Sequence, residues 1–451
     1  MAPQTMKRRL EAIHRHVGTG SAPAASGAKV RASAASARAA GCFKLDAPAK
    51  LSARAAPGRR LLAFAPWLLA VFAPVHPCAG SADTRAPRAQ DVVVTFGEIM
   101  GRLTPPGFLR LRQTRDFEVT YAGAEASVAS SVQYFGGNAR FVTALPKNVL
   151  GDATVDSVRA LGVDCDYMMR TDDGRLGLYF LESGANQRGS TVTYDRADSS
   201  ISMTPADAYD WDAIFADAQW LHLSGITPAI SEVAANATLV AAQKAKEHGC
   251  QVSIDLNFRG NLWKWEPGTD ERDLCQRVMR EILPFVDFSI GNEEDCFDVL
   301  GIRAGDTDVE AGELDTARYP DVARQVVEQF PNISRVAITL RESYSATHNN
   351  WGAMLYTAEG DSAVFAPLDE DGNYESYEIK NIVDRVGGGD SFAAGLIFAL
   401  TTPELSDPQD AIAYAVAASC LKHSIKGDFN YTTRAEVESL MGGSGSGRVV
   451  R

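Results

Sequence analysis

Asp384-Arg385-Val386-Gly387-Gly388-Gly389-Asp390 leads directly into the small and apolar residues Ser391-Phe-Ala-Ala-Gly-Leu-Ile-Phe-Ala-Leu400. Three successive glycines let the backbone approach a ligand closely, and the free N–H groups of the following helix point back toward them. The stretch is therefore typical of an anion site at a helix N-terminus. A carboxylate at Asp390 could take a proton from an attacking hydroxyl, so the pattern indicates phosphoryl transfer.

A plainer interpretation of the same stretch is that Asp390 only caps a glycine-rich helix entry. Neither G-x-x-x-x-G-K-[ST] nor G-x-G-x-x-G occurs in this segment, so the two common nucleotide-binding loops are not favoured. The choice between catalysis and capping therefore depends on the rest of the chain.

Two further polar segments follow predicted buried strands. Asn292-Glu293-Glu294-Asp295 comes after the strand expected at 287–290, and its oxygens could hold Mg²⁺ through water. The alternative is an acidic first helical turn that favours the helix dipole. Asn257 and Arg259 follow the strand expected at 252–256, and arginine offers a planar fork for phosphate or carboxylate. An ion pair in solvent is the alternative for Arg259.

The body of the chain alternates short β-branched runs with helical patterns from residue 91 onward. Strands are expected at 92–96, 140–144, 220–224, 252–256, 287–290 and 336–340, and helices at 124–135, 149–161, 232–247 and 270–282. Such a series predicts a mostly parallel sheet covered on both faces. The stretches 102–120 and 176–194 resemble hairpins instead, which predicts a small sheet that projects from the body as a lid.

The residues described so far resemble those of the PfkB/ribokinase-like carbohydrate kinases. Asp384–Asp390 is similar to the D-T-x-G-A-G-D signature, Asn292–Asp295 to the N-x-x-E magnesium motif, and Ala122–Ala129 to the early G-G-x-x-x-N-x-A segment. The resemblance extends over about 350 residues, from Val92 to Leu440. The segments 96–100, 194–196, 255–259 and 427–430 look most like 2-keto-3-deoxygluconate kinases.

This resemblance implies a ribokinase-like α/β/α sandwich with a small β-sheet lid, and an ATP- and Mg²⁺-dependent transfer to a sugar acid. It assigns catalysis to Asp390 as base and to the N–H groups of Gly387, Gly388 and Gly389. By the same match, the substrate would contact Gly123, Ser127, Tyr179, Tyr194, Arg196 and Arg259. The nucleotide would contact Asn257, Asn292, Arg341, Gly387 and Gly389, and the metal Asn292, Glu294 and Asp295. A monovalent-cation requirement stays open.

Several positions depart from the family pattern and weaken the substrate assignment more than the chemistry. Arg385 stands where the signature has threonine, Asp295 is one methylene shorter than the motif glutamate, and Ser127 replaces an asparagine. Residues 341–350 form a longer loop than the usual nucleotide loop. The alternatives are a fructokinase- or ribokinase-type enzyme for a neutral sugar, and a catalytically silent sugar-binding member of the fold.

Charge and cysteine content exclude several other classes. Residues 1–90 carry a net charge of +11, whereas the whole chain carries −13, so the remainder is strongly acidic at −24. Nucleic-acid and anionic-membrane binding depend on clustered Lys and Arg and are therefore not expected. The seven cysteines are widely spaced and include no C-x-x-C pair, which argues against zinc and a disulfide framework.

The ends of the chain are expected to lie outside the catalytic domain, which we place at 91–441. Residues 1–60 are rich in Ala, Ser and Arg, and an apolar run at 61–75 contains two prolines and is too short for a confident membrane span. The prediction is a plastid or mitochondrial leader over 1–90; otherwise this is a disordered extension of a cytoplasmic enzyme. Residues 442–451 are expected to form a flexible tail, and a homodimer could form through the lid edges.

Overall fold

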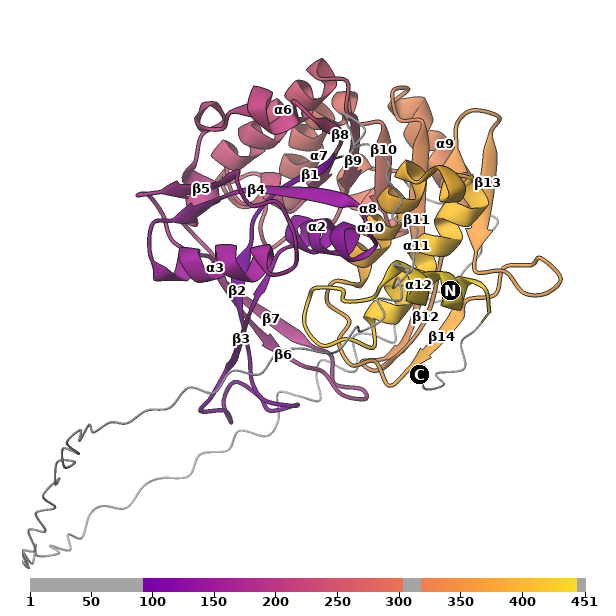
Figure 1. The fold of residues 1–451 in the computed structure, drawn as a ribbon, viewed down its shortest axis with the longest axis horizontal. Helices are drawn as coiled ribbons and strands as arrows, with labels where there is room; N and C mark the ends of the chain where they lie inside the picture. Colours follow the sequence, from indigo (N-terminus) through magenta and orange to yellow (C-terminus); the bar gives the residue numbers. More distant parts are fainter. Residues whose placement is uncertain (1–91, 303–317, 444–451) are drawn as a thin grey trace, which may run out of the picture. The chain divides into compact units, whose positions relative to one another are not determined.

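A computed structural model describes residues 92–302 and 318–443, and its main feature is a ten-stranded sheet between two layers of helices (Figure 1). The strands lie in the order β13-β12-β11-β10-β9-β8-β1-β4-β5, with β14 paired to β12. All pairs from β11 to β5 are parallel, and the pairs made by β12 are antiparallel. Their bounds are Val92–Phe96 (β1), Asn138–Pro146 (β4), Met168–Thr171 (β5), Ala218–Ser224 (β8), Gln251–Asp255 (β9), Phe288–Gly291 (β10), Arg335–Ser345 (β11), His348–Thr357 (β12), Ser362–Ala366 (β13) and Tyr377–Lys380 (β14).

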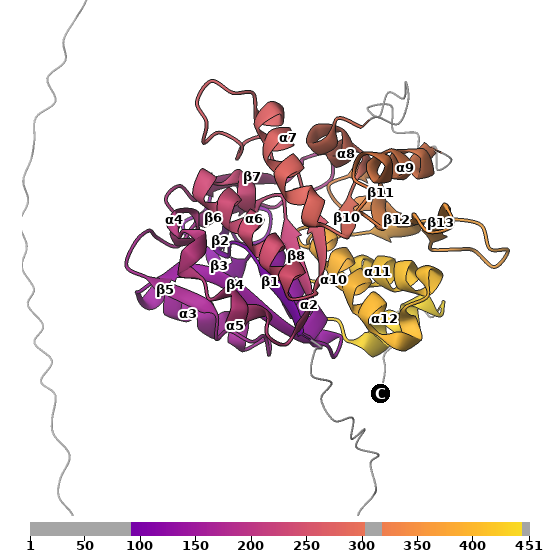
Figure 2. The same ribbon diagram turned by 90° about the horizontal axis from the view of Figure 1, so that it is seen from above.

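On each face of this sheet, apolar side chains of the strands pack against one layer of helices. One layer holds α5 (Trp211–Phe215), α6 (Glu232–Glu247), α7 (Glu271–Ile282), α8 (Glu293–Leu300) and α9 (Tyr319–Gln329). The other holds α2 (Ala124–Tyr134), α3 (Val149–Arg159), α10 (Gly388–Thr401), α11 (Pro408–Lys422) and α12 (Arg434–Met441). Figure 2 shows α8 and α9 on one side of β10 to β12, and α10 to α12 on the other.

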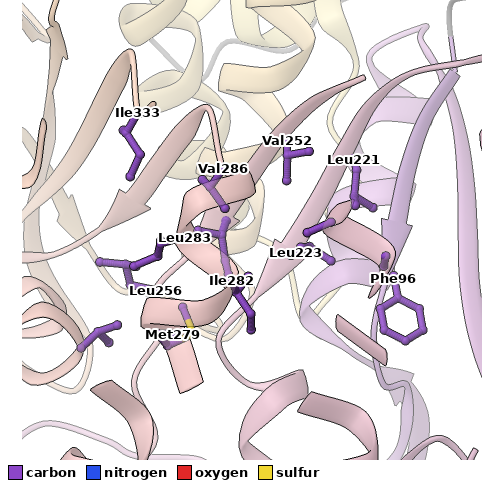
Figure 3. Close-up of a cluster of buried hydrophobic side chains, with 14 of the residues drawn as sticks. Phe96, Leu221, Leu223, Val252, Leu256, Met279, Ile282, Leu283, Val286 and Ile333 are labelled. Carbon is purple, nitrogen blue, oxygen red and sulfur yellow. The ribbon is translucent and has the colours of Figure 1, made fainter. Parts of the chain in front are cut away.

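The first of the two layers is anchored by aliphatic residues from adjacent strands. Leu221 and Leu223 of β8 and Val252 of β9 are fully buried in one hydrophobic cluster that also contains Met279 and Ile282 of α7 (Figure 3). Near-continuous burial on both faces is what a parallel sheet requires, and it explains why these strands were predictable as apolar runs. The core therefore fixes the carboxyl ends of the strands, where the polar residues follow.

A second, smaller sheet has the order β3-β2-β6-β7 and confirms the predicted fold class of a large, mostly parallel sheet with a small β lid (Figure 1). Its strands are β2 (Met100–Thr104), β3 (Glu118–Ala122), β6 (Leu178–Glu182) and β7 (Thr191–Asp195), and the short helix α4 (Ser200–Met203) follows. Two antiparallel hairpins are joined by the parallel pair β2–β6. All five residues of the edge strand β7 are exposed, and dimer formation through this sheet stays a prediction.

One local prediction was wrong, and one alternative interpretation is excluded. The segment 341–350 is no loop, because β11 and β12 continue through it as an antiparallel hairpin in which Arg341 lies opposite Trp351. The helix after the glycines begins earlier than the capping alternative required: Gly387 is its N-cap, and Asp390 lies inside its first turn. The predicted leader, and the tail from residue 444, lie outside the described residues. Within the described ranges, no helix combines the length and apolar character that a bilayer crossing requires.

Candidate active site

A cavity of about 410 Å³ lies where β1, β8, β9 and β10 end and beside the middle of β11. The chain runs from β1 to β4 and β5 on one side and returns through β8 on the other, so the cavity lies at the point where strand order reverses, a common ligand site in α/β sheets. The sequence-predicted residues that line it are Gly123, Tyr179, Tyr194, Arg196, Asn257, Arg259, Asn292, Glu294, Asp295, Arg341, Gly387, Gly388, Gly389 and Asp390.

Ser127 is the exception among the predicted site residues, because it does not line the cavity. It lies one turn into α2, is fully buried, and has a hydroxyl without a hydrogen-bond partner. The backbone N–H of Ser127 donates to the carbonyl of Gly123, which places Ser127 one helical turn behind that cavity-lining residue. A substrate contact at Ser127 is therefore not supported by the geometry.

Two of the glycines at the start of α10, Gly387 and Gly389, lack a side chain for different structural reasons. Gly387 has a φ of +83°, and a Cβ there would lie 2.1 Å from the carbonyl oxygen of Asp428, so only glycine fits the fold. A Cβ on Gly389 would meet no protein atom within 4 Å, and this residue lines the cavity. Packing of the protein thus explains Gly387 but not Gly389, whose missing side chain leaves space on the ligand side.

Asp390 carries its carboxyl into this cavity from the first turn of α10. Burial, together with the negative charges of Asp428 and Glu125, raises the pKa of Asp390 to about 7. Arg259 and Lys422 act in the opposite direction and favour the ionised form of Asp390. A carboxylate with a pKa near neutrality is suited to accept a proton from a hydroxyl and to exist in the basic form at working pH.

The predicted metal segment forms a reciprocal cap at the start of α8. Asn292 Oδ1 accepts from the N–H of Asp295 at 2.8 Å, and Asp295 accepts from the N–H groups of Asn292 and Phe258 at 3.2 and 2.9 Å. The capping alternative is therefore present in the geometry, but both residues still line the cavity beside Glu294. Across the described ranges, no three His, Cys, Asp or Glu side chains converge to hold a metal ion.

The carboxylates near this cap nevertheless suit a cation. Asp255, Asp295 and Asp390 all line the cavity, and burial together with the charges of the other two raises the pKa of Asp255 well above its usual range. Hard oxygen donors of this kind match Mg²⁺, which commonly keeps its waters and binds substrate phosphates as well. Asn292, Glu294 and Asp295 are the residues that would hold such an ion, mainly through water.

One side of the cavity consists of residues whose polar groups are engaged within the protein; we call Glu98, Glu125, Tyr179, Arg196 and Asp428 the paired wall. Arg196 forms a buried ion pair with Glu98, and its guanidinium lies 5.1 Å from the ring centre of Tyr194. The hydroxyl of Tyr179 donates to both carboxylate oxygens of Asp428, at 2.8 and 3.0 Å. The hydroxyl of Tyr179 and the charge of Arg196 are thus already engaged within the protein.

Another part of the lining has cationic groups without such partners. Arg259, Arg341 and Arg385, which we call the arginine rim, form no ion pair with any carboxylate in the described ranges. Arg259 donates to its neighbouring carbonyl of Phe258, and Arg385 to the carbonyls of Ser345 and Ala346. Burial and the nearby Arg341 lower the pKa of Arg385, as expected for like charges that lack a counter-ion. The rim is therefore suited to anions.

Among the charged cavity residues, sequence reasoning assigned no site role to Glu98, Glu125 and Asp428. Burial raises the pKa of Glu125 to about 8, and its Oε1 accepts from the hydroxyl of Thr227 at 2.7 Å. A signal was present for Glu125, since a lone acid among the small residues 122–129 is unusual at a buried helix start. Asp428 had no local signal, because its partners lie more than 200 residues away.

Comparison with known proteins places this site in a family. Residues 90–430 match the model of the pfkB family carbohydrate kinases. The chain belongs to the pfkB carbohydrate kinase family. A 2-dehydro-3-deoxygalactonokinase of Haloferax volcanii is 32% identical over 355 residues, covering 79% of this chain and 98% of that protein. A 2-dehydro-3-deoxygluconokinase of Bacillus subtilis is 24% identical over 349 residues, or 77% of this chain and 94% of that one.

A solved structure agrees with this pfkB family assignment. The 2-dehydro-3-deoxygluconokinase of Thermotoga maritima has a TM-score of 0.70 and 43% sequence identity, and the match covers 78% of this chain and all of that one. Membership of this family makes the chain a carbohydrate kinase. The predicted family and fold are confirmed.

Proposed function

We propose that this pfkB kinase transfers the γ-phosphoryl of ATP to a hydroxyl of a 2-keto-3-deoxy sugar acid, of the gluconate or galactonate series, with Mg²⁺. The names of the relatives in Haloferax volcanii and Thermotoga maritima support this acceptor class. Their two acceptors differ only in the configuration at one carbon. We therefore propose the sugar-acid class and treat the choice between the two series as the outcome of an assay.

The observation that carries the proposal is Arg259 in the same cavity as Asp390, without a carboxylate partner among the described residues. Arg259 lies within electrostatic reach of Asp255, Asp295 and Asp390 but forms no direct ion pair with them, so its guanidinium can still bind a ligand carboxylate, which a neutral sugar lacks. Arg196 supports the proposal less than expected, because Glu98 already neutralises it. A silent binding protein would not need a carboxyl with a pKa near 7 beside an anion-binding helix terminus.

In the proposed mechanism, Asp390 accepts the proton of the acceptor hydroxyl as that oxygen attacks the γ-phosphorus. The N–H groups of the first turn of α10 lack partners within the helix and point toward the transferring group, where they stabilise its developing charge. Arg341 and Arg385 would bind the nucleotide phosphates, and Asn257, which follows β9 and lines the cavity, would contact the nucleotide. The metal would neutralise phosphate charge at Asn292, Glu294 and Asp295.

The direct test is an acceptor panel with the purified full chain and Mg-ATP. The acceptors are 2-keto-3-deoxygluconate, 2-keto-3-deoxygalactonate, fructose and ribose, compared by kcat/KM. We expect one or both sugar acids to exceed the neutral sugars by at least about 100-fold, the range over which a charge-assisted pair discriminates. A preference for fructose or ribose would replace this proposal with the neutral-sugar alternative.

A further inference from the structure

Arg102 is a fully buried arginine that no part of the proposed mechanism uses. It lies on β2 of the small sheet, where only 2% of its side chain is exposed. Its two terminal nitrogens bond separately to Asp384 and Asp428, and its Nε donates to Thr104 Oγ1 at 3.0 Å. One guanidinium thus connects the small sheet to two loops that lie 282 and 326 residues further along the chain.

Both carboxylates are themselves built into the backbone around the catalytic turn. Asp384 accepts from the N–H of Val386 through one oxygen and from the N–H of Gly427 through the other, each at 3.1 Å. Its two oxygens therefore fix the start of the glycine segment to the loop at 427–430. The backbone of Asp428 also lies directly against Gly387, the N-cap of α10.

The small sheet meets the catalytic turn through apolar contact as well. Its own core consists of Met100, Ala122, Tyr179 and Leu181, and Val386 packs against that cluster from the glycine segment. So few apolar residues bury little area, and the charged contacts of Arg102 must supply much of the orientation. The position of the sheet and the position of the turn are consequently set by the same group.

We propose that Arg102 is a positioning residue for phosphoryl transfer, which holds the turn bearing Gly387–Gly389 and Asp390 in register with the small sheet that covers the acceptor. The inference rests on the kinase reaction but not on the identity of the acceptor. Arg102 touches neither the acceptor nor the nucleotide, since it does not line the cavity, and it acts through Asp384 and Asp428.

The charges around Arg102 favour a positioning role for this residue over a role in packing alone. Burial raises the pKa of Asp428, while Arg102 and the hydroxyl of Tyr179 act to keep it ionised. The two carboxylates in turn raise the pKa of Arg102, so the cation stays charged although it is buried. Lys422 is also fully buried and lies within electrostatic reach of both acids. Its ammonium group donates a hydrogen bond to the carbonyl of Ile425. Without Arg102, a buried carboxylate would remain directly behind the catalytic turn.

The test compares Arg102→Lys and Thr104→Val with Arg175→Lys as matched control. Lysine keeps the charge of Arg102 but cannot bind two carboxylates in a fixed fork. Thr104→Val removes only the Nε contact and is the milder variant if Arg102→Lys folds poorly. Arg175 forms a two-bond pair with Asp195 beside the same sheet, but that pair is exposed and lies outside the cavity lining. Each full-length variant is examined by backbone hydrogen exchange and by steady-state kinetics.

We expect Arg102→Lys to accelerate exchange in segments 384–390 and 427–430, and to lower kcat by about 100-fold with KM for ATP changed much less. Thr104→Val should show the same pattern at a smaller size, and Arg175→Lys should match the wild type in both measurements. Unchanged exchange in those segments with kcat within threefold of wild type would overturn the proposal. So would a loss of activity with uniformly faster exchange across the large sheet, because that indicates general destabilisation. Exchange needs no substrate, so the result is independent of the acceptor assignment.

Discussion

The paired wall and the arginine rim line the same cavity, yet they use charge in opposite ways. In the paired wall, Arg196 meets Glu98 and Tyr179 meets Asp428, and all four side chains are buried. In the rim, Arg259 and Arg341 are exposed to the cavity and have no carboxylate partner in the described ranges. The difference indicates that the charges of the paired wall maintain the fold of the site, while those of the arginine rim are available to bind a ligand.

Asp390 lines the same cavity and interacts electrostatically with both regions, and its loss should have the largest effect. Asp390→Asn removes the base but keeps the size and the place in α10, so we expect kcat to fall by about 10³-fold. Thermal stability should not decrease, because burial disfavours the native charge. Asp410→Asn is the control, since Asp410 occupies the first turn of α11 away from the cavity. Turnover of Asp390→Asn near the wild-type rate would show that Asp390 is not the base.

Arg196→Met tests whether the wall is structural. Glu98 would be left buried without its cation, and removal of one partner from a buried ion pair commonly costs about 3–5 kcal/mol. Urea unfolding should therefore show a large loss of free energy of unfolding. The same change at Arg175, whose pair with Asp195 is exposed, should alter stability little. Equal stability of the two variants would contradict the role given to the paired wall.

The rate should depend on pH through Asp390. Since burial raises its pKa to about 7, the proton-accepting form is lost as pH falls below that value. We expect kcat/KM to decline about tenfold per pH unit on the acid side and to level off above neutrality. A rate constant that is flat from pH 5 to 8 would mean that the charges of Arg259 and Lys422 outweigh burial.

Gly389→Ala is expected to have the smallest effect, and one of opposite sign on stability and activity. A Cβ there meets no protein atom, and alanine is favoured over glycine in a helix by about 1 kcal/mol, so unfolding should occur at equal or higher temperature. The added methyl enters ligand space and should lower kcat/KM by about tenfold. Gly395→Ala provides the contrast, because its Cβ would lie 2.9 Å from Ala415 Cα and should destabilise the protein. Unchanged activity of Gly389→Ala would remove the ligand-side reason for this glycine.

Most of the fold could be predicted because its signals are local. β-branched runs marked the parallel strands, and the helix expected at 232–247 has those bounds in the structure. The hairpin β11–β12 was missed because Arg341 to Asn350 is polar and resembles a loop. The segment forms strands because β11 pairs with β12 and β12 pairs with β14, and not because of its own composition.

The residues that line the candidate cavity were largely predictable, but their pairings were not. Glycines and acids at strand ends indicated the cavity, and all but Ser127 of the predicted residues line it. Sequence could not show that Glu98 would neutralise Arg196 and leave Arg259 free, since that partner lies 98 residues away. Arg385 illustrates the same limit: its charge was evident, but the carbonyls of the β11–β12 hairpin that hold it were not.

The most direct test of the central claim is the ratio of kcat/KM for the preferred sugar acid to that for fructose, measured in the wild type and in Arg259→Met. If the rim arginine binds the acceptor carboxylate, the wild-type ratio should exceed about 100, and the variant should lose most of it with little change in fructose turnover or stability. A variant that retains the wild-type ratio would contradict the role of Arg259, and a wild-type ratio below one would contradict the sugar-acid assignment itself.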